Sequence, residues 1–420
     1  MSAKDHIQAL IQEAAASGLP LDRLRGFAFY DMQKDERVIA LQSFAEAEQA
    51  IIQIPDFVAR LGADSARRAT LQCVYQYFSR LDGVRYDEAV FNALWEDFTA
   101  EIGNPEWITR GITNVRFFRS ENLHIDLGDG VAIRGRNPEE LSALGFSPAI
   151  LGRTMDDWLI GFGSSSFVLV AQDSVPKEPA NLISTSDVWT KAVRAIGACR
   201  LAAAGSISIS AMWVTRVARF NVGIGGLSQI GATVPTIGSD YIWSDAVQAA
   251  YPQIYAELKK LESSGYGASP GNLAIALRSF MGTYDRWPTL HESQLLDTIT
   301  ALEALLGTET EIAFKLAFRV AALLASSDAE RAHILKTMKD FYDTRSKLVH
   351  GAALKPKHHQ CLQSVDDLRA LVRKLLRAFV ALAANPPATY NKAFFNERLD
   401  MALVDATERE NLRAALRLNE

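Results

Sequence analysis

The sequence predicts an α+β fold, with a mixed, β-rich N-terminal part followed by a C-terminal all-α helical bundle. Apolar and polar residues alternate through much of 112–237, as they do in half-buried strands. From Ser244 onward apolar residues instead recur every three or four positions, as they do in amphipathic helices. We therefore expect a mainly helical segment with a short strand pair, a β-rich α+β sensor or regulatory module, a helical bundle and a helical tail: 1–110, 111–240, 241–390 and 391–420.

Helical periodicity dominates the first segment. It predicts four helices: 1–18, 44–60, 65–81 and 87–102. The second helix is expected to end near Gly62, and the third carries an apolar stripe that includes Val74 and Phe78. Two short stretches between the first two helices, 24–30 and 37–41, are predicted as a pair of strands.

Alternation and turn residues predict the elements of the β-rich module. Strands are expected over 114–118, 123–127, 131–134, 167–170, 207–218 and 230–237. Gly128-Asp129-Gly130 supplies a turn between the second and third of them. One helix is expected over 186–204, before Gly205, and a short one begins at Asn137, where Pro138 takes the first helical position.

The C-terminal part is predicted to be helical almost throughout. Helices are expected over 246–261, 272–285, 290–306, 311–325, 329–349, 360–384 and the tail 391–418. The Ser- and Gly-rich stretch 263–271 is the best candidate for a boundary, and Asn385-Pro386-Pro387 ends the last long helix.

Composition indicates an ordinary soluble protein, with 48% hydrophobic and 22% charged residues. The N-terminal 18 residues have no apolar signal-peptide core, and no apolar stretch is long enough to cross a membrane, so we expect a cytoplasmic location. The three cysteines, Cys73, Cys199 and Cys361, are scattered. That number and spacing fit a reducing compartment and argue against a disulfide framework or a zinc site. No cofactor and no metal are expected.

Positive charge gathers near the C-terminal end of the bundle, although the whole chain has a net charge of −5. Residues 335–380 contain four aspartates and ten basic residues: Lys336, Lys339, Arg345, Lys347, Lys355, Lys357, Arg369, Arg373, Lys374 and Arg377. The segment therefore carries +6 and the remainder −11. A basic region on an acidic body can attract a polyanion such as RNA, or it can be only the solvated face of charged helices.

The most informative motif is Arg345-x4-His350 at the end of the helix predicted over 329–349. Ser346 follows the arginine directly, and Gly351 is well placed as the left-handed residue that stops the helix. A histidine moves a proton near neutral pH, and an arginine holds a phosphate with a permanent charge. These three side chains, Arg345, Ser346 and His350, are our candidate catalytic residues. The structural alternative is a surface ion pair and a histidine that caps the helix.

Arg345 falls in the apolar row of its helix. The row steps through Ile334, Met338, Phe341, Arg345 and Leu348. A guanidinium in that row needs a partner, because an unpaired buried charge is costly. Glu303 also lies close to an apolar row, and we expect it to pair with Arg345 inside the bundle; an exposed glutamate is the alternative.

Three stretches of the C-terminal part together resemble the HEPN superfamily, and within it the Apea-like branch. They are Leu295 to Gly307 (LLDTITALEALLG), Lys315 to Leu324 (KLAFRVAALL) and Phe341 to Gly351 (FYDTRSKLVHG), and the resemblance covers about 272–385. It implies an up-and-down helical bundle that dimerises and that places an R-x4–6-H motif of each protomer at a shared cleft. It also implies metal-independent cleavage of RNA in toxin, anti-phage or CRISPR-linked systems.

Carried over residue by residue, the motif falls on Arg345 and His350, with Ser346 as the polar residue after the arginine. Lys347, Lys355 and Lys357 are candidate RNA-backbone contacts, and Glu303 and Asp343 are candidate supporting residues. The expected partners are RNA and a second copy of the chain, with a phage or regulatory partner at the N-terminal module. A non-catalytic RNA-binding or dimer-scaffold protein remains the alternative. His358-His359 with Cys361 offers too few ligands for a metal site.

Overall fold

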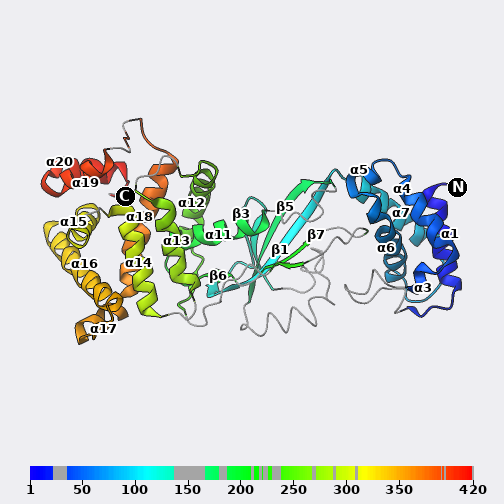
Figure 1. The fold of residues 1–420 in the computed structure, drawn as a ribbon, viewed down its shortest axis with the longest axis horizontal. Coiled ribbons are helices and arrows are strands. Elements are labelled where there is room, and N and C mark those ends of the chain that lie inside the picture. Colours follow the sequence, from blue (N-terminus) through cyan, green and yellow to red (C-terminus); the bar gives the residue numbers. More distant parts are fainter. Residues whose placement is uncertain are drawn as a thin grey trace.

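The structure is a computed structural model. It describes residues 1–21, 36–136, 166–178, 187–209, 212–216, 220, 226–228, 238–266, 271–286, 290–307, 311–388, 390–391 and 394–418. N-terminal helices, a sheet and a larger helical body containing the C-terminus follow one another along the longest axis (Figure 1). The α+β class predicted from the sequence is confirmed.

The N-terminal part is a small helical unit with its own apolar core. Its described elements are α1 (Ala3–Ala16), α3 (Glu36–Ile39), α4 (Gln42–Ile52), α5 (Phe57–Leu61), the 3₁₀ turn η2 (Ala63–Ser65), α6 (Ala66–Ser79) and α7 (Glu88–Gly103). The Ser2 hydroxyl and the Asp5 carboxylate form a capping box that starts α1. Trp107 and Phe220, which belong to the neighbouring sheet region, join the same buried cluster.

Two predictions for this part are wrong. Residues 37–41, predicted as a strand, are helical as far as Ile39 in α3. The expected helix over 44–60 is two helices, because α4 ends at Ile52 and Asp56 takes a left-handed backbone with φ of 65° before α5. The other predicted strand, 24–30, lies outside the described residues.

An antiparallel sheet forms the middle of the molecule. Among the described residues its strand order is β3-β4-β5-β1-β7-β8, with β6 also paired to β1. The bounds are β1 (Glu106–Arg116), β3 (His124–Gly128), β4 (Val131–Gly135), β5 (Phe167–Pro176), β6 (Ser208–Ile209), β7 (Met212–Arg216) and β8 (Gly226–Ser228). The predicted turn at Gly128-Asp129-Gly130 is present, and all three residues have positive φ, which explains the two glycines. The predicted helix start at Asn137 and the strand at 230–237 lie outside the described residues.

One apolar core joins this sheet to the helices that follow it. Helix α11 (Val188–Ala202) contacts β5 on one side and α12 and α18 on the other. A short parallel pair, β2 (Phe118–Arg119) with β9 (Tyr241–Ile242), brings the chain back before α12. The buried cluster runs without interruption from Val115 in β1 to Leu418 near the C-terminus.

The C-terminal body consists of long helices packed side by side and of shorter helices joined to them (Figure 1). They are α12 (Asp245–Ser263), α13 (Leu273–Asp285), α14 (His291–Leu306), α15 (Ile312–Leu324), α16 (Asp328–Val349), α17 (Pro356–Gln363), α18 (Val365–Ala384), α19 (Phe395–Val404) and α20 (Ala406–Ala415). The predicted start of the last long helix at 360 is wrong, because α17 begins at Pro356 and α18 is a separate helix. The tail is two short helices that pack on α15. No described helix is both long enough and apolar enough to cross a lipid bilayer.

A buried arginine fastens the C-terminal pair of helices to the bundle. The Arg319 side chain has no exposed surface; it donates to the Leu306 carbonyl at 2.7 Å and to the Asp400 carboxylate of α19 at 2.7 Å. This placement explains why a charged residue lies in the otherwise apolar run of α15, since its charge is paired and its donors are used.

We predict that Asp400→Ala lowers the free energy of unfolding by about 2 kcal/mol, because Arg319 would keep its carbonyl partner but lose its counter-charge. Urea denaturation of the full chain measures this. Glu397→Ala removes a carboxylate from an exposed position on the same helix and should change stability by less than about 0.5 kcal/mol. Equal losses in both variants would contradict a specific role for the buried pair.

Candidate functional site

Helix α16 carries the Arg345-x4-His350 motif, and both ends of the helix are set by local sequence. The Ser327 hydroxyl accepts from the Glu330 amide at 3.2 Å at the start. At the other end Gly351 has φ of 65°, its amide donates to the Leu348 carbonyl, and the Ala352 amide donates to the Lys347 carbonyl. This is a Schellman motif, so the predicted left-handed glycine is confirmed, and His350 is the C-cap residue directly after Val349, the last residue of α16.

Arg345 is half-buried between α16 and α14. Its Nη2 lies 3.5 Å from Oε2 of Glu303, and the other carboxylate oxygen of Glu303 accepts from the Tyr342 hydroxyl at 3.1 Å. The guanidinium carbon is also 5.7 Å from the centre of the Tyr342 ring. The predicted contact between Glu303 and Arg345 is therefore formed. Burial, together with the nearby Glu303 charge, raises the pKa of Tyr342, so its hydroxyl stays protonated as a donor.

The pair is not sealed from solvent. The Arg345 and Glu303 side chains are 28% and 22% exposed, so an anion can approach the guanidinium without unfolding the bundle. At 3.5 Å the contact is longer than a good charge-assisted hydrogen bond, which leaves Arg345 able to exchange one acceptor for another.

His350 lies on a different side of the helix end. It is exposed, and its side chain makes no hydrogen bond or ion pair with any residue that the structure describes. Five residues separate it from Arg345, about 140° around an ideal helix. Within a single chain the two motif side chains are held by different surroundings: Arg345 packs against α14, and His350 faces solvent beside the half-buried Ser346.

A buried histidine next to this site was not singled out from the sequence. His358 in α17 is 1% exposed, and its Nδ1 accepts from the Lys355 amide at 2.9 Å while its Nε2 lies 3.1 Å from the Asp343 carboxylate of α16. Because the backbone amide must donate, Nδ1 is unprotonated and Nε2 carries the proton that Asp343 accepts. A proline at the first helical position, in the run Lys355-Pro356-Lys357-His358, is the sequence signal for a helix start here. From the sequence, His358 was considered only as a metal ligand.

His358 thereby connects the start of α17 to α16, so the loop that begins at His350 is held at both of its ends. Lys357 strengthens the connection, since its Nζ lies 2.7 Å from the same Asp343 oxygen. These two hydrogen bonds, first Lys357 and then His358, hold the pKa of Asp343 below its usual range. Asp343 also raises the pKa of Lys357. The charge of Lys357 is thus already compensated, whereas Lys355 is exposed and Lys347 half-buried.

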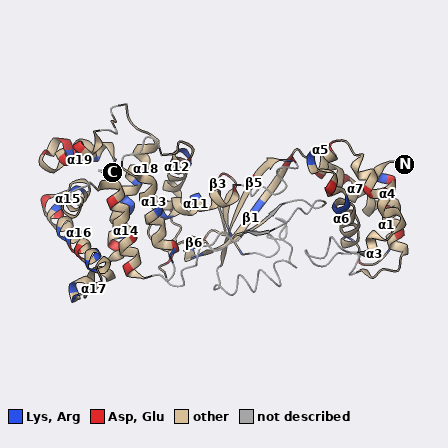
Figure 2. Cartoon of the chain, in the orientation of Figure 1, with Lys and Arg blue, Asp and Glu red and all other residues tan. Residues whose placement is uncertain are grey.

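Figure 2 marks in blue the lysine and arginine positions along α16 and α17. No group of three or more His, Cys, Asp or Glu side chains in the described part of the chain is arranged to hold a metal ion. The site is therefore built from one paired arginine, one exposed histidine and lysines close to them in sequence.

Comparison with protein-family models, curated proteins and solved structures gives no match to this chain. The interpretation of the site consequently rests on the residues themselves and on their geometry.

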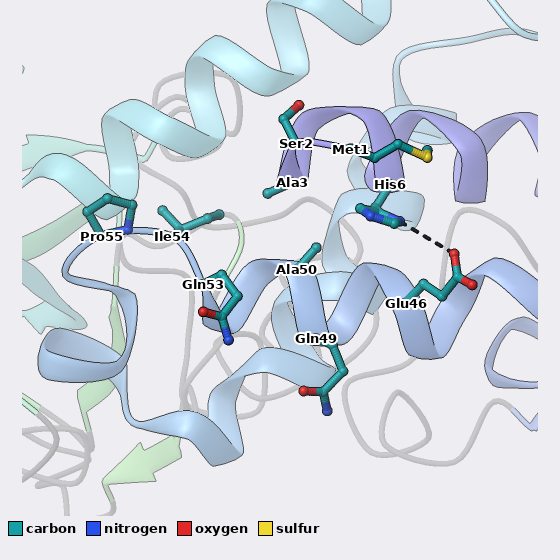
Figure 3. A pocket seen from close by; sticks show the side chains of 10 residues that line it. All are labelled: Met1, Ser2, Ala3, His6, Glu46, Gln49, Ala50, Gln53, Ile54 and Pro55. Carbon is teal, nitrogen blue, oxygen red and sulfur yellow. Dashed lines mark ion pairs between the residues drawn. The ribbon is translucent and has the colours of Figure 1, made fainter.

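The N-terminal helices contain a separate hollow of about 590 Å³, lined by the start of α1 and by α4 and the residues after it (Figure 3). His6 and Glu46 form an ion pair at 3.5 Å on its wall. The other lining side chains are small, apolar or amide: Met1, Ser2, Ala3, Gln49, Ala50, Gln53, Ile54 and Pro55. None of the motif residues lines it, and its helices lie at the opposite end of the molecule from α16 (Figure 1).

The lowered pKa of Asp343 predicts a pH-dependent contribution to stability. A carboxylate with a folded-state pKa below that of the unfolded chain stabilises the fold at pH values above about 4, and the contribution disappears as the pH falls through the folded pKa. Asp343→Asn should therefore be less stable than the wild type at pH 6–7, and the two unfolding free energies should converge as the pH is lowered toward about 2.

Urea titrations at several pH values measure this difference. Asp340→Asn is the matched control, because Asp340 lies about one turn earlier on α16 and acts on Lys357 only through its charge, whereas Asp343 contacts Lys357 and His358 directly. The same pH dependence in both variants would show that the contacts of Asp343 with Lys357 and His358 contribute nothing.

Proposed function

We propose that this chain is a metal-independent endoribonuclease of the HEPN type, acting as an anti-phage or toxin effector. One observation carries the proposal: the R-x4-H motif lies at a Schellman-terminated helix end, with a partly exposed arginine on one side and an exposed histidine at the C-cap position. These are the groups that phosphodiester cleavage requires, a fixed cation for the phosphate and a proton carrier that works near neutral pH.

The proposed reaction is attack of an RNA 2′-hydroxyl on the adjacent phosphorus. The new bond joins O2′ to phosphorus, and the bond between phosphorus and O5′ breaks. The products are a 2′,3′-cyclic phosphate and a 5′-hydroxyl end. His350 serves as general base for the 2′-hydroxyl proton or as general acid for the leaving O5′, and the second proton transfer falls to another group.

Arg345 stabilises the negative charge that develops on the non-bridging oxygens. Glu303 and the Tyr342 ring hold its guanidinium at the surface between α14 and α16, which limits the freedom that would be lost on binding RNA. In this proposal Ser346 donates a hydrogen bond to the same phosphate, and Lys347, Lys355 and Lys357 flank the path of the RNA backbone. Since Lys357 is paired with Asp343, we assign it more to positioning α17 than to binding RNA.

A second copy of the chain completes the site in this proposal. Within one chain Arg345 and His350 are held in different surroundings, so a shared cleft between two α16 helix ends is the simplest way to bring an arginine and a histidine to one phosphate. The exposed His350 is available for such a contact.

The first test is cleavage of a defined RNA by purified full-length variants. His350→Ala should reduce the rate by about 10²–10⁴-fold, through loss of proton transfer. Arg345→Ala should reduce it by about 10²–10³-fold, through loss of charge stabilisation. Arg345→Lys should fall between wild type and Arg345→Ala, because a lysine keeps the charge without the planar fork.

Matched controls are His359→Ala and Arg377→Ala, which remove the same side-chain types from exposed positions and should retain wild-type rates. An equimolar mixture of Arg345→Ala and His350→Ala chains should regain activity if the two residues of one site come from different chains. Wild-type protein that binds RNA but leaves it intact would contradict the nuclease assignment and favour the RNA-binding alternative.

The second test concerns the chemistry. RNA with a single 2′-deoxy substitution should resist cleavage at that linkage, because the attacking group is missing, and DNA should not be cut. Excess EDTA should leave the rate unchanged, and mass spectrometry should find 2′,3′-cyclic phosphate ends. Cleavage at a 2′-deoxy linkage, or loss of activity with EDTA that is restored by a divalent cation, would refute the mechanism.

A further inference from the structure

Three arginines surround one tyrosine at the seam between the sheet and the helical body. The guanidinium carbons of Arg200 (α11) and Arg369 (α18) lie 4.5 and 4.1 Å from the centre of the Tyr284 ring. Arg373, one turn after Arg369, donates to the Tyr284 hydroxyl at 3.1 Å. Tyr284 itself, Arg200 and Arg369 are at most 5% exposed, so this is a concentration of positive charge in a largely dry place.

The negative charge around this cluster is incomplete. Asp285 pairs with Arg200 through both of its oxygens, one of them at 2.8 Å. Asp366 pairs with Arg369 at 2.7 Å, but its carboxylate is 77% exposed, at the rim of the cluster. Arg373 donates only to neutral oxygens among the described residues: the Arg200 carbonyl at 2.8 Å and the Tyr284 hydroxyl.

An unused donor lies at the same place. The Nε of Arg369 has no hydrogen-bond partner among the residues that the structure describes, and the side chain that carries it is 93% buried. A buried charged group normally has every donor satisfied, because an unmade hydrogen bond there is costly. Among the described residues, Arg373 thus has no carboxylate partner and Arg369 has an unsatisfied buried donor, and the two lie one turn apart on α18.

We propose that Arg369 and Arg373, supported by Arg200, bind a dianionic phosphate group, either inorganic phosphate or the terminal phosphate of a monoester. Such a group supplies the missing negative charge and acceptor oxygens, and arginine forks match its geometry. Asp366 is the exposed member of the cluster, and in this proposal the phosphate displaces its carboxylate from Arg369. A diester is disfavoured, since it carries one negative charge where two are needed, and its two bulky substituents would have to fit against Arg200 and Arg369, which are at most 5% exposed.

The location gives such a ligand a structural consequence. Arg200 lies on the helix that packs against β5, whereas Arg369 and Arg373 lie on α18 within the bundle. A phosphate held by both helices would brace the sheet against the helical body. This site shares no residue with the Arg345 motif, and the inference does not rest on the proposed nuclease activity.

Isothermal titration of the full chain with inorganic phosphate, at constant ionic strength set with sodium chloride, tests the proposal. Wild type should bind phosphate, and Arg373→Gln should weaken binding at least about tenfold, as expected for one charge-assisted hydrogen-bond partner. Arg373→Lys guards against misfolding, because it keeps the charge, and should bind with intermediate affinity. Lys374→Gln removes an equal charge from the exposed next position and should bind as wild type does.

Asp366→Asn provides the sharpest arm, because removing the competing carboxylate should tighten phosphate binding, whereas Asp367→Asn on the same turn should not. Adenosine 5′-monophosphate should bind, and the diester thymidylyl-3′,5′-thymidine, which has no 2′-hydroxyl to react, should not. Absence of phosphate binding in the wild type, equal weakening by Arg373→Gln and Lys374→Gln, or equal binding of the diester would each overturn the proposal.

Discussion

Several helices of this protein carry an arginine on the face that packs against other helices. The packing of the helical body depends on giving each of these buried positive charges a carboxylate partner. A guanidinium cannot lose its proton at accessible pH, so burying it requires acceptors that the fold must deliver from other elements. Arg319, Arg200 and Arg345 obtain theirs from α19, α13 and α14 respectively. Each pair therefore fixes the spacing between two helices as well as a charge.

The pairs differ in how far the arginine is buried, and that burial determines whether another anion can reach the guanidinium. Arg319 is fully enclosed and its acceptors are short, which suits a permanent fastening of the C-terminal helices. Arg345 is partly open and its contact with Glu303 is long, which suits a cation that exchanges a carboxylate for a phosphate. The same residue type is thus closed to solvent in one row and open to it in another, and the proposed ligand exchange at Arg345 depends on that openness.

His358 stabilises the segment that follows the candidate site residue His350. Its buried ring joins a backbone amide of α17 to a carboxylate of α16, so the loop between His350 and Lys355 is closed at its far end. His350, the proposed proton carrier, follows the last residue of α16 and makes no side-chain hydrogen bond with a described residue. The contacts of Asp343 with Lys357 and His358 connect α16 to α17 and so hold both ends of the loop that follows His350.

Local information in the sequence determined most of the elements and the motif. Hydrophobic periodicity, capping residues and turn glycines correctly predicted the α+β class, helix α16 with its end at Gly351, and the turn at 128–130. These features depend on neighbours only a few residues away in the sequence. The same signals failed at 37–41 and at the start of α17, where short stretches have ambiguous patterns. The contact of Glu303 with Arg345 was predicted because both residues lie in or near the apolar row of their helices, where a buried charge needs a partner of opposite charge.

Only the tertiary structure decided which distant residues meet. The burial of His358 against Asp343, the hydroxyl of Tyr342 on Glu303 and the gathering of Arg200, Arg369 and Arg373 around one ring depend on how separate helices pack. Nothing in the spacing of these residues encodes those contacts. They arise because the apolar core fixes helix positions first, and polar side chains must then find acceptors within that frame.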